Sequence, residues 1–271
     1  MIGTYKIADR IVRIESIYPR IHEYCKEYEY VADDDNGGGD SDARAGASAS
    51  DIDISIVMSR QDIEFEKSRS TSDAGTAGDA GTAGTAAPVD FFQDDYYEEQ
   101  AVHRKLSTAM LRFRTFLFHG SAIAMDGQAY IFAAPSGTGK STHTRLWREC
   151  FGDRVVMVND DKPYIRVDEE EKRAWVYGTP FNGKHRLGTN ICVPIKAICL
   201  LSRGEKNEIT CAEKKEAYPL LLQQTYRPQD PQELAKTLEL LDRLTFSVEL
   251  YKLNCNMEPD AARVSYEGMH G

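Results

Sequence analysis

Several features that would assign this chain to a common class of protein are missing from its sequence. Its six cysteines occur singly with no C-x-x-C pair, so we expect reduced thiols and no structural zinc. No apolar run approaches the roughly 18 residues of a membrane-spanning helix. The 33 Lys and Arg residues are outnumbered by 43 Asp and Glu, which argues against a nucleic-acid partner or an anionic membrane surface.

The first residues, "MIGTYKIADR", also lack the apolar core of a signal peptide. Together with reduced thiols, this predicts a cytoplasmic protein. The chain has 271 residues, of which 41% are hydrophobic, so a sizeable core can form in one large domain or two small ones.

Two low-complexity segments interrupt the chain. "DDDNGGGDSDARAGASAS" (33–50) is acidic and small, and "SDAGTAGDAGTAGTAAP" (72–88) is a short Ala-Gly-Thr repeat. Neither can bury enough apolar surface to offset the entropy lost on ordering, so we expect disordered insertions in surface loops. They lie in a predicted β-rich N-terminal extension, residues 1–90, and the predicted catalytic domain occupies residues 91–271.

Ordinary periodicity predicts the remaining elements. The expected strands are 4–16, 51–58, 115–125, 128–134, 154–159, 191–203 and 248–257. A short helix or a turn is expected over 59–70, and helices are expected over 90–113, from 142, over 231–246 and over 258–269. This alternation is typical of an α/β fold.

One stretch carries a specific chemical signal. "AAPSGTGKSTHTRLW" (133–147) ends its glycine-rich part as a P-loop does, with Gly139, Lys140 and Ser141, although Ala134 stands where the first glycine of G-x-x-x-x-G-K-[ST] belongs. It follows an apolar strand and begins a helix, which is the context a phosphate-binding loop requires. The predicted nucleotide-binding residues are Ser136, Gly137, Thr138, Gly139, Lys140, Ser141 and Thr142.

Each loop residue has an expected task. The backbone N–H groups surround phosphate oxygens, Lys140 meets the β- and γ-phosphates, and the Ser141 hydroxyl holds Mg²⁺. The expected ligands are therefore ATP and Mg²⁺. The alternative, a Gly/Ser turn between a strand and a helix, carries no such chemistry.

A pair of carboxylates follows the next buried strand, in "VVMVNDD". Beside Mg²⁺ and a γ-phosphate, Asp160 can hold the metal and Asp161 can take the proton of an attacking hydroxyl. The alternative is an Asp-Asp turn that only ends the strand.

Two further segments are candidates for the site. The loop "VYGTPFNGKHRLGTN" (176–190) could place Lys184 and Arg186 beside phosphate oxygens, or it could be a solvated basic turn. "DGQ" (126–128) is a hairpin signal, so the P-loop strand should pair antiparallel with the strand before it. That hairpin could bring His119 toward the γ-phosphate; a lone His near a strand end is otherwise a packing residue.

The run "FHGSAIAMDGQAYIFAAPSGTGKST" followed by "VVMVNDD" resembles the C-terminal catalytic domain of the HPr kinase/phosphorylase family. More closely, it resembles the small HPr-kinase-like proteins found beside peptide-modification genes. The resemblance implies the P-loop fold shared with ATP-dependent phosphoenolpyruvate carboxykinases, with a mixed, partly antiparallel sheet. It also implies catalytic roles for His119, Lys140 and Asp161, with Asp161 as general base, and metal binding by Ser141 and Asp160.

The sequence thus predicts an ATP-dependent kinase that transfers the γ-phosphoryl group to a hydroxyl of a protein or peptide, with Ser favoured. A small-metabolite kinase stays open, and so does a non-catalytic nucleotide-binding scaffold in a peptide-maturation system. Neither a nucleic acid nor a membrane is expected as a partner, and the sequence leaves the oligomeric state and the acceptor open.

Overall fold

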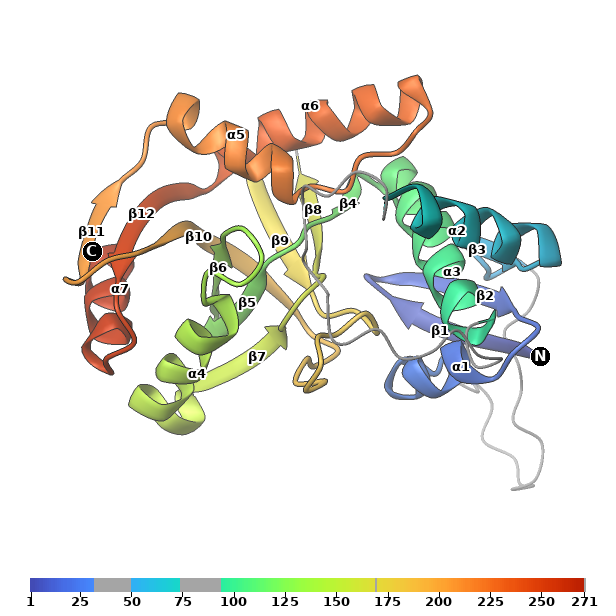
Figure 1. The fold of residues 1–271 in the computed structure, drawn as a ribbon, viewed down its shortest axis with the longest axis horizontal. Helices are drawn as coiled ribbons and strands as arrows, with labels where there is room; N and C mark the ends of the chain where they lie inside the picture. Colours follow the sequence, from blue (N-terminus) through green and yellow to red (C-terminus); the bar gives the residue numbers. More distant parts are fainter. Residues whose placement is uncertain (32–49, 74–93, 169, 271) are drawn as a thin grey trace. The chain divides into compact units, whose positions relative to one another are not determined.

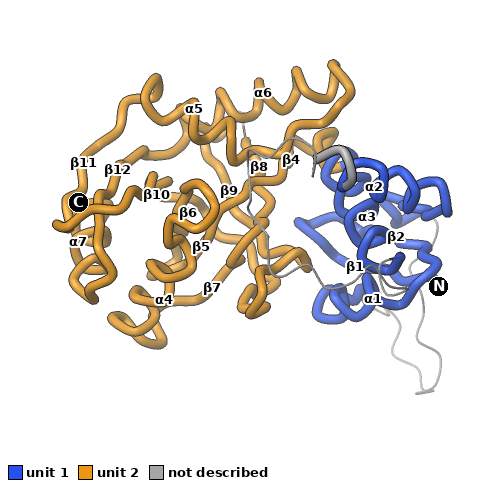
Figure 2. Tube along the Cα trace, in the orientation of Figure 1, with its two compact units in different colours: residues 1–109 blue, residues 110–271 orange. Residues whose placement is uncertain are grey.

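The computed structural model describes residues 1–31, 50–73, 94–168 and 170–270 (Figure 1). The segments 33–50 and 72–88 lie almost entirely outside these ranges, so their expected disorder stays a prediction. The chain divides into two compact units, Met1–Ala109 and Met110–Gly271 (Figure 2). None of the six cysteines, all within the described residues, forms a disulfide bond.

Unit 1 contains a three-stranded sheet in the order β1-β2-β3 and the helices α1, α2 and α3. Its elements are β1 Ile2–Ile7, β2 Arg10–Glu15, α1 Arg20–Tyr24, the 3₁₀ turn η1 Lys26–Tyr28, β3 Ile54–Val57, α2 Arg60–Asp73 and α3 Asp94–Met110. The single strand expected over 4–16 is wrong. Ala8 and Asp9 have φ of 49° and 60°, which turns the segment into the β1–β2 hairpin.

Helix α3 belongs to unit 1 because its acidic side chains hold the backbone that follows β2. Glu98 is 1% exposed and accepts hydrogen bonds from the N–H groups of Ile17 (2.6 Å) and Tyr18 (2.9 Å). Arg20 donates to Glu99 at 2.7 Å. The units therefore divide after Ala109, whereas the sequence placed the boundary at residue 90.

Unit 2 is built on a mixed sheet of nine strands. The path β4-β8-β9-β10-β6-β5-β7 is extended by β12 beside β10 and by β11 beside β12. The strands are β4 Thr115–Leu117, β5 Ser121–Met125, β6 Gln128–Ala133, β7 Val155–Asn159, β8 Tyr164–Asp168, β9 Arg173–Tyr177, β10 Cys192–Arg203, β11 Glu208–Cys211 and β12 Glu249–Cys255. Strand β10 runs parallel to β6 and to β12, and the other pairs of this sheet are antiparallel.

The predicted hairpin before the P-loop is confirmed. Strands β5 and β6 pair antiparallel with Met125 opposite Gln128. Asp126 and Gly127 between them have φ of 52° and 78°, the two positive values that a two-residue hairpin turn needs. The fold class, mixed α/β with a partly antiparallel sheet, is therefore as expected.

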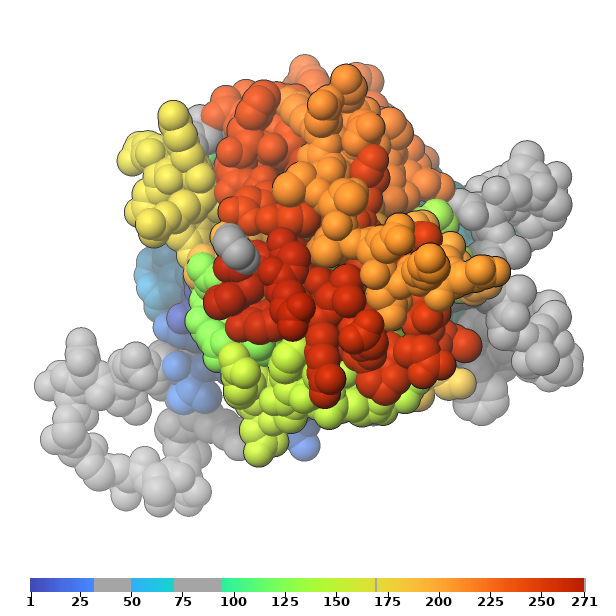
Figure 3. Space-filling model, turned by 90° about the vertical axis from the view of Figure 1, so that its left-hand side faces the viewer, coloured from blue at the N-terminus to red at the C-terminus, as the bar shows by residue number. Residues whose placement is uncertain are grey.

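Helices cover both faces of this sheet, as Figure 1 shows. The helices of unit 2 are α4 Lys140–Phe151, α5 Lys214–Gln224, α6 Pro231–Ser247 and α7 Asp260–His270, with 3₁₀ turns η2 Leu111–Phe113 and η3 Gly152–Arg154. Aliphatic residues of α5 and α6 pack on one face, and α4 and α7 pack together on the other. In the space-filling view, α7 (red) lies at the surface beside α4 (yellow-green) (Figure 3).

Strand β6 is apolar along its whole length because it lies between these two layers. Ile131 and Ala133 join the α5/α6 core, whereas Tyr130 and Phe132 join the α4/α7 core. Burial on both faces is the reason that this strand shows no polar alternation.

The α4/α7 core contains a buried polar cluster. His143 of α4 is 2% exposed, and the indole Nε1 of Trp147 donates to its Nε2 at 3.2 Å. Ser265 Oγ of α7 accepts from the same indole at 2.8 Å. Burial lowers the pKa of His143 to about 4, so the imidazole is neutral.

A transmembrane segment was not expected. Within the ranges that the structure describes, no helix has the length and apolar character that crossing a bilayer requires.

Candidate functional site

The glycine-rich loop joins β6 to α4, and the first side chain of α4 donates a hydrogen bond back to the backbone at the start of the loop. Gly137 and Gly139 have φ of 76° and 126°, values that side chains with a Cβ rarely adopt, and a Cβ at either position would meet nothing within 4 Å. Conformation, not space, therefore requires glycine at both positions. Ala134, in place of the first glycine, is fully buried, and its carbonyl accepts a hydrogen bond from Lys140 Nζ at 2.8 Å.

Lys140 is the first residue of α4, and it is buried to 8% exposure. Burial lowers the pKa of its ammonium group, and the negative charge of Asp161 partly offsets that effect. Within the described residues this ammonium has one hydrogen-bond acceptor, although it carries three donors. A buried cation with spare donors at a helix N-terminus suits an anionic group with several oxygens, such as a phosphate.

The remaining loop residues face outward. Ser136, Gly137 and Ser141 are exposed, and Thr142 is half-buried in the first turn of the helix. Gly139, the N-cap of α4, has no side chain to cap the first N–H groups of the helix. The residues that the sequence assigned to nucleotide binding therefore form one accessible loop, although their binding role stays a prediction.

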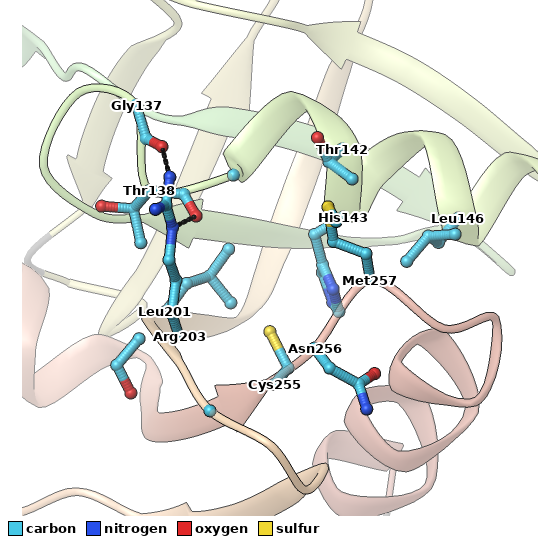
Figure 4. A pocket seen from close by; sticks show the side chains of 13 residues that line it. Gly137, Thr138, Thr142, His143, Leu146, Leu201, Arg203, Cys255, Asn256 and Met257 are labelled. Atoms are coloured by element: carbon cyan, nitrogen blue, oxygen red, sulfur yellow. Dashed lines mark hydrogen bonds between the residues drawn. The ribbon is translucent and has the colours of Figure 1, made fainter.

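A cavity of about 460 Å³ lies directly beside this loop (Figure 4). Its walls come from the loop, the first turns of α4, the end of β10 and the segment after β12, and they include Leu146, Cys255 and Met257. Arg203 at the end of β10 donates to the carbonyls of Gly137 and, at 3.3 Å, of Thr138. The cavity has the volume of a small-molecule site, and the glycine-rich loop forms one of its walls.

The second side of the site begins where β7 ends. Asn159 is fully buried, and its Oδ1 accepts from the N–H groups of Asp161 (2.9 Å) and Lys162 (2.6 Å). Its Nδ2 donates to Thr179 Oγ1 at 3.1 Å and to the Thr179 carbonyl at 3.3 Å. One amide therefore fixes the turn that carries the carboxylate pair and ties it to the chain after β9.

Asp161 faces His119. The Nε2 atom of His119 lies 3.3 Å from Asp161 Oδ1, and the N–H of Gly120 donates to the Asp161 carbonyl at 2.9 Å. Burial alone would raise the pKa of Asp161. The hydrogen bond from His119 and the charges of Lys162 and Lys140 outweigh burial and lower that pKa below its usual value, so the carboxyl group is ionised at neutral pH.

Asp160 points away from this pair, toward the loop after β9. Asp160 is 8% exposed, and its Oδ1 accepts from the N–H of Gly183 at 2.7 Å. A Cβ at Gly183 would lie 2.9 Å from Asp160 Oδ2, so the close approach depends on glycine. Lys184 and Arg186 follow on the same loop with exposed side chains, and their contact with phosphate stays a prediction.

The structure thus brings His119, Lys140 and Asp161 into one electrostatically coupled group. Among the described residues, no group of three or more His, Cys, Asp or Glu side chains is placed to hold a metal ion. Mg²⁺ at nucleotide sites commonly uses one or two protein ligands, with phosphates and water completing its shell. Ser141 is exposed at the start of α4, and Asp160 has a carboxylate oxygen beyond its bond to Gly183, but their joint binding of Mg²⁺ stays a prediction.

Three residues of the site were not singled out from the sequence: Asn159 as a structural amide, Thr179 and Gln224. Thr179 is fully buried, and its hydroxyl donates to the Lys162 carbonyl at 2.8 Å. Gln224 ends α5 and reaches both His119 and the P-loop. The position of Asn159 immediately before the Asp pair was the available signal for one of them, and no short motif marks the other two.

Comparison with known proteins adds little. No protein-family model matches the chain, and no curated protein matches its sequence. Among solved structures, the Hpr(Ser) kinase/phosphatase from Coxiella burnetii is similar over 57% of this chain and 99% of that chain, with 10% identity and a TM-score of 0.32. The likeness is therefore a distant one.

Proposed function

We propose that unit 2 is an ATP-dependent kinase that transfers the γ-phosphoryl group to a hydroxyl of a protein or peptide, with Ser as the favoured acceptor. The observation that carries the proposal is that Lys140, on the loop side of the site, interacts electrostatically with Asp161, on the carboxylate side. The buried Lys140 at the start of α4 and the Asp161 carboxylate shift each other's pKa, and the loop residues that precede Lys140, Gly137 to Gly139, line a cavity of about 460 Å³.

Each side has a chemical task in this proposal. The loop N–H groups and the Lys140 ammonium bind the β- and γ-phosphates, and the cavity takes the nucleoside. Ser141 and Asp160 would hold Mg²⁺, whose charge offsets that of the phosphates. His119 and Asp161 lie on the side of the acceptor, where Asp161 receives a proton.

The transfer step balances without a further reactant. The acceptor oxygen forms a bond to the γ-phosphorus, and the bond from that phosphorus to the β–γ bridging oxygen breaks. The hydroxyl proton passes to Asp161, and ADP leaves. The transition state of such transfers is loose, so positioning and charge contribute more than basicity. A carboxylate with a lowered pKa can therefore serve, because it is ionised whenever the acceptor arrives.

The test is a single-turnover measurement with ATP labelled in the γ-phosphoryl group, using Ser-containing peptides, free serine and other small alcohols as acceptors. Asp161→Asn keeps the shape of the side chain but makes it a very poor proton acceptor. We expect it to lower the transfer rate by roughly 10²–10⁴, the usual contribution of a positioned base, and to leave MgATP affinity within a few-fold.

Asp153→Asn is the matched control, because Asp153 is exposed in the turn after α4. It should transfer at the parent rate. Transfer to small alcohols but not to peptides would show that the acceptor is a small molecule and not a protein or peptide. Binding of MgATP without transfer to any acceptor, in the parent as in Asp161→Asn, would make unit 2 a nucleotide-binding scaffold and overturn the proposal.

A further inference from the structure

Gln224, the last residue of α5, contacts His119 through both its backbone and its side chain. The Gln224 carbonyl accepts a hydrogen bond from the His119 N–H at 2.7 Å, and the residue is 5% exposed. The end of its side chain lies within hydrogen-bond distance of three atoms. These are the His119 carbonyl (3.2 Å), the Ala134 carbonyl (3.1 Å) and His119 Nδ1 (2.9 Å).

Two of these three atoms decide which way the amide points. A backbone carbonyl oxygen can only accept a hydrogen bond. The atom that faces the carbonyls of His119 and Ala134 must therefore be the amide nitrogen of Gln224, because the amide oxygen would repel both. That nitrogen carries two hydrogens, which three acceptors on one side can share.

The orientation of the amide then decides where the imidazole proton lies. With the amide nitrogen as the donor, His119 Nδ1 accepts, so it carries no proton. The ring proton therefore lies on Nε2, the atom that is 3.3 Å from Asp161 Oδ1. His119 therefore donates to Asp161, which is the polarity that keeps this carboxylate ionised.

We propose that Gln224 is a positioning residue that fixes the tautomer of His119 and thereby directs the Nε2 proton to Asp161. Its role in phosphoryl transfer rests on the proposed function, whereas the tautomer does not. The Ala134 carbonyl that Gln224 reaches is the one that accepts from Lys140 Nζ. A single amide therefore connects the His119–Asp161 pair with the phosphate-binding loop.

A merely structural amide would satisfy the same carbonyls without controlling a proton. Gln224→Glu tests the control of the proton when the tautomer itself is measured, because glutamate has the same shape but cannot donate when ionised. A carboxylate at this position would attract a proton to His119 Nδ1. Gln223→Glu is the matched control: Gln223 is the preceding residue of the same helix, and its side chain is exposed.

The measurement is ¹⁵N NMR of histidine-labelled protein at neutral pH, in which the ring-nitrogen shifts report the protonated atom. The chain has six histidines, and His119→Gln identifies the resonance. We expect the parent and Gln223→Glu to show His119 protonated on Nε2, and Gln224→Glu to show a proton on Nδ1. The parent spectrum suffices should Gln224→Glu fail to fold. His119 protonated on Nδ1 in the parent would overturn the proposal.

Single-turnover transfer completes the test. We expect Gln224→Glu to lower the transfer rate roughly 10- to 100-fold, the usual loss when a partner that orients a reacting group is removed, with MgATP affinity within a few-fold. A switched tautomer with an unchanged transfer rate would overturn the positioning role. A parent that shows the Nε2 tautomer but transfers to no acceptor would instead contradict the proposed function and leave the tautomer assignment standing.

Discussion

The two sides of the candidate site are held in place by different parts of the chain. The loop side comes from one short stretch, in which two glycines with positive φ, the Ala134 carbonyl and Lys140 hold one another. The carboxylate side combines Asn159, two residues before Asp161, with three residues from distant segments, namely His119, Thr179 and Gln224.

Because of this difference, we expect the loop side to determine the affinity for the ligand and the carboxylate side to determine how the reacting groups are aligned. The loop side can present N–H groups and a cation to an anion with few contributions from elsewhere in the fold. On the carboxylate side, Asp161 reaches its position only when the strands, the loops and the end of α5 have packed together. Changes on the loop side should therefore alter ligand affinity alone, whereas changes on the carboxylate side should alter the stability of unit 2 as well.

The largest expected effect is on the loop side. Lys140→Ala removes the buried ammonium, and we expect the affinity for ATP to fall by at least about 100-fold, because charge-assisted contacts with two phosphate groups disappear. The melting temperature without nucleotide should stay close to that of the parent, because removing the ammonium also removes its desolvation cost. Isothermal calorimetry and thermal unfolding measure the two quantities.

Arg145→Ala is the control for this change, since Arg145 lies on the same helix with an exposed side chain paired to Glu149. Its ATP affinity should match that of the parent. If the Lys140→Ala protein binds ATP normally, the loop does not bind the phosphates, and the contrast between the two sides of the site does not hold.

The next effect is on the carboxylate side. Asn159→Asp replaces an amide that donates to Thr179 with a carboxylate that cannot donate, in a fully buried position. We expect the free energy of unfolding to fall by about 2–3 kcal/mol, and the transfer rate to fall with it. Urea unfolding followed by circular dichroism gives the first value.

Asn254→Asp makes the same chemical change at an exposed position, where the amide oxygen accepts from Ser202 Oγ and a carboxylate can do so equally. It should change stability by less than about 0.5 kcal/mol. An Asn159→Asp protein as stable as this control would show that the carboxylate side is held as locally as the loop side.

The same contrast explains what could be predicted from the sequence. The β5–β6 hairpin, the apolar P-loop strand and the start of the next helix are encoded by adjacent residues, so pattern and turn chemistry identify them. His119 precedes β5 and Asp161 follows β7, so their approach depends on the pairing of two strands that are separated in sequence by β6 and α4. The approach was expected mainly from resemblance to a known family, not from spacing.

The residues that were missed act over long sequence distances. Gln224 ends a helix that was not predicted at all, because Pro219 lies inside α5 and removes one of its backbone hydrogen bonds. Asn159 and Thr179 are polar residues whose burial emerges only when β7 and the chain after β9 pack together. Glu98 likewise acts over a long sequence distance, since it binds backbone about 80 residues earlier in the chain.

The neutral His143 behind the loop makes unit 2 sensitive to acid. An unfolded histidine has a pKa near 6.5, whereas burial holds the pKa of His143 at about 4. Between these two pH values the unfolded chain binds a proton at this histidine and the folded chain does not. The contribution of this histidine to stability is complete above pH 6.5 and is lost as the pH falls toward 4, with about 1 kcal/mol gone at pH 5.5. Unfolding measured at pH 7.5 and 5.5 should show that decrease in the parent and not in His143→Gln, and an equal decrease in both would mean that the proton binds elsewhere.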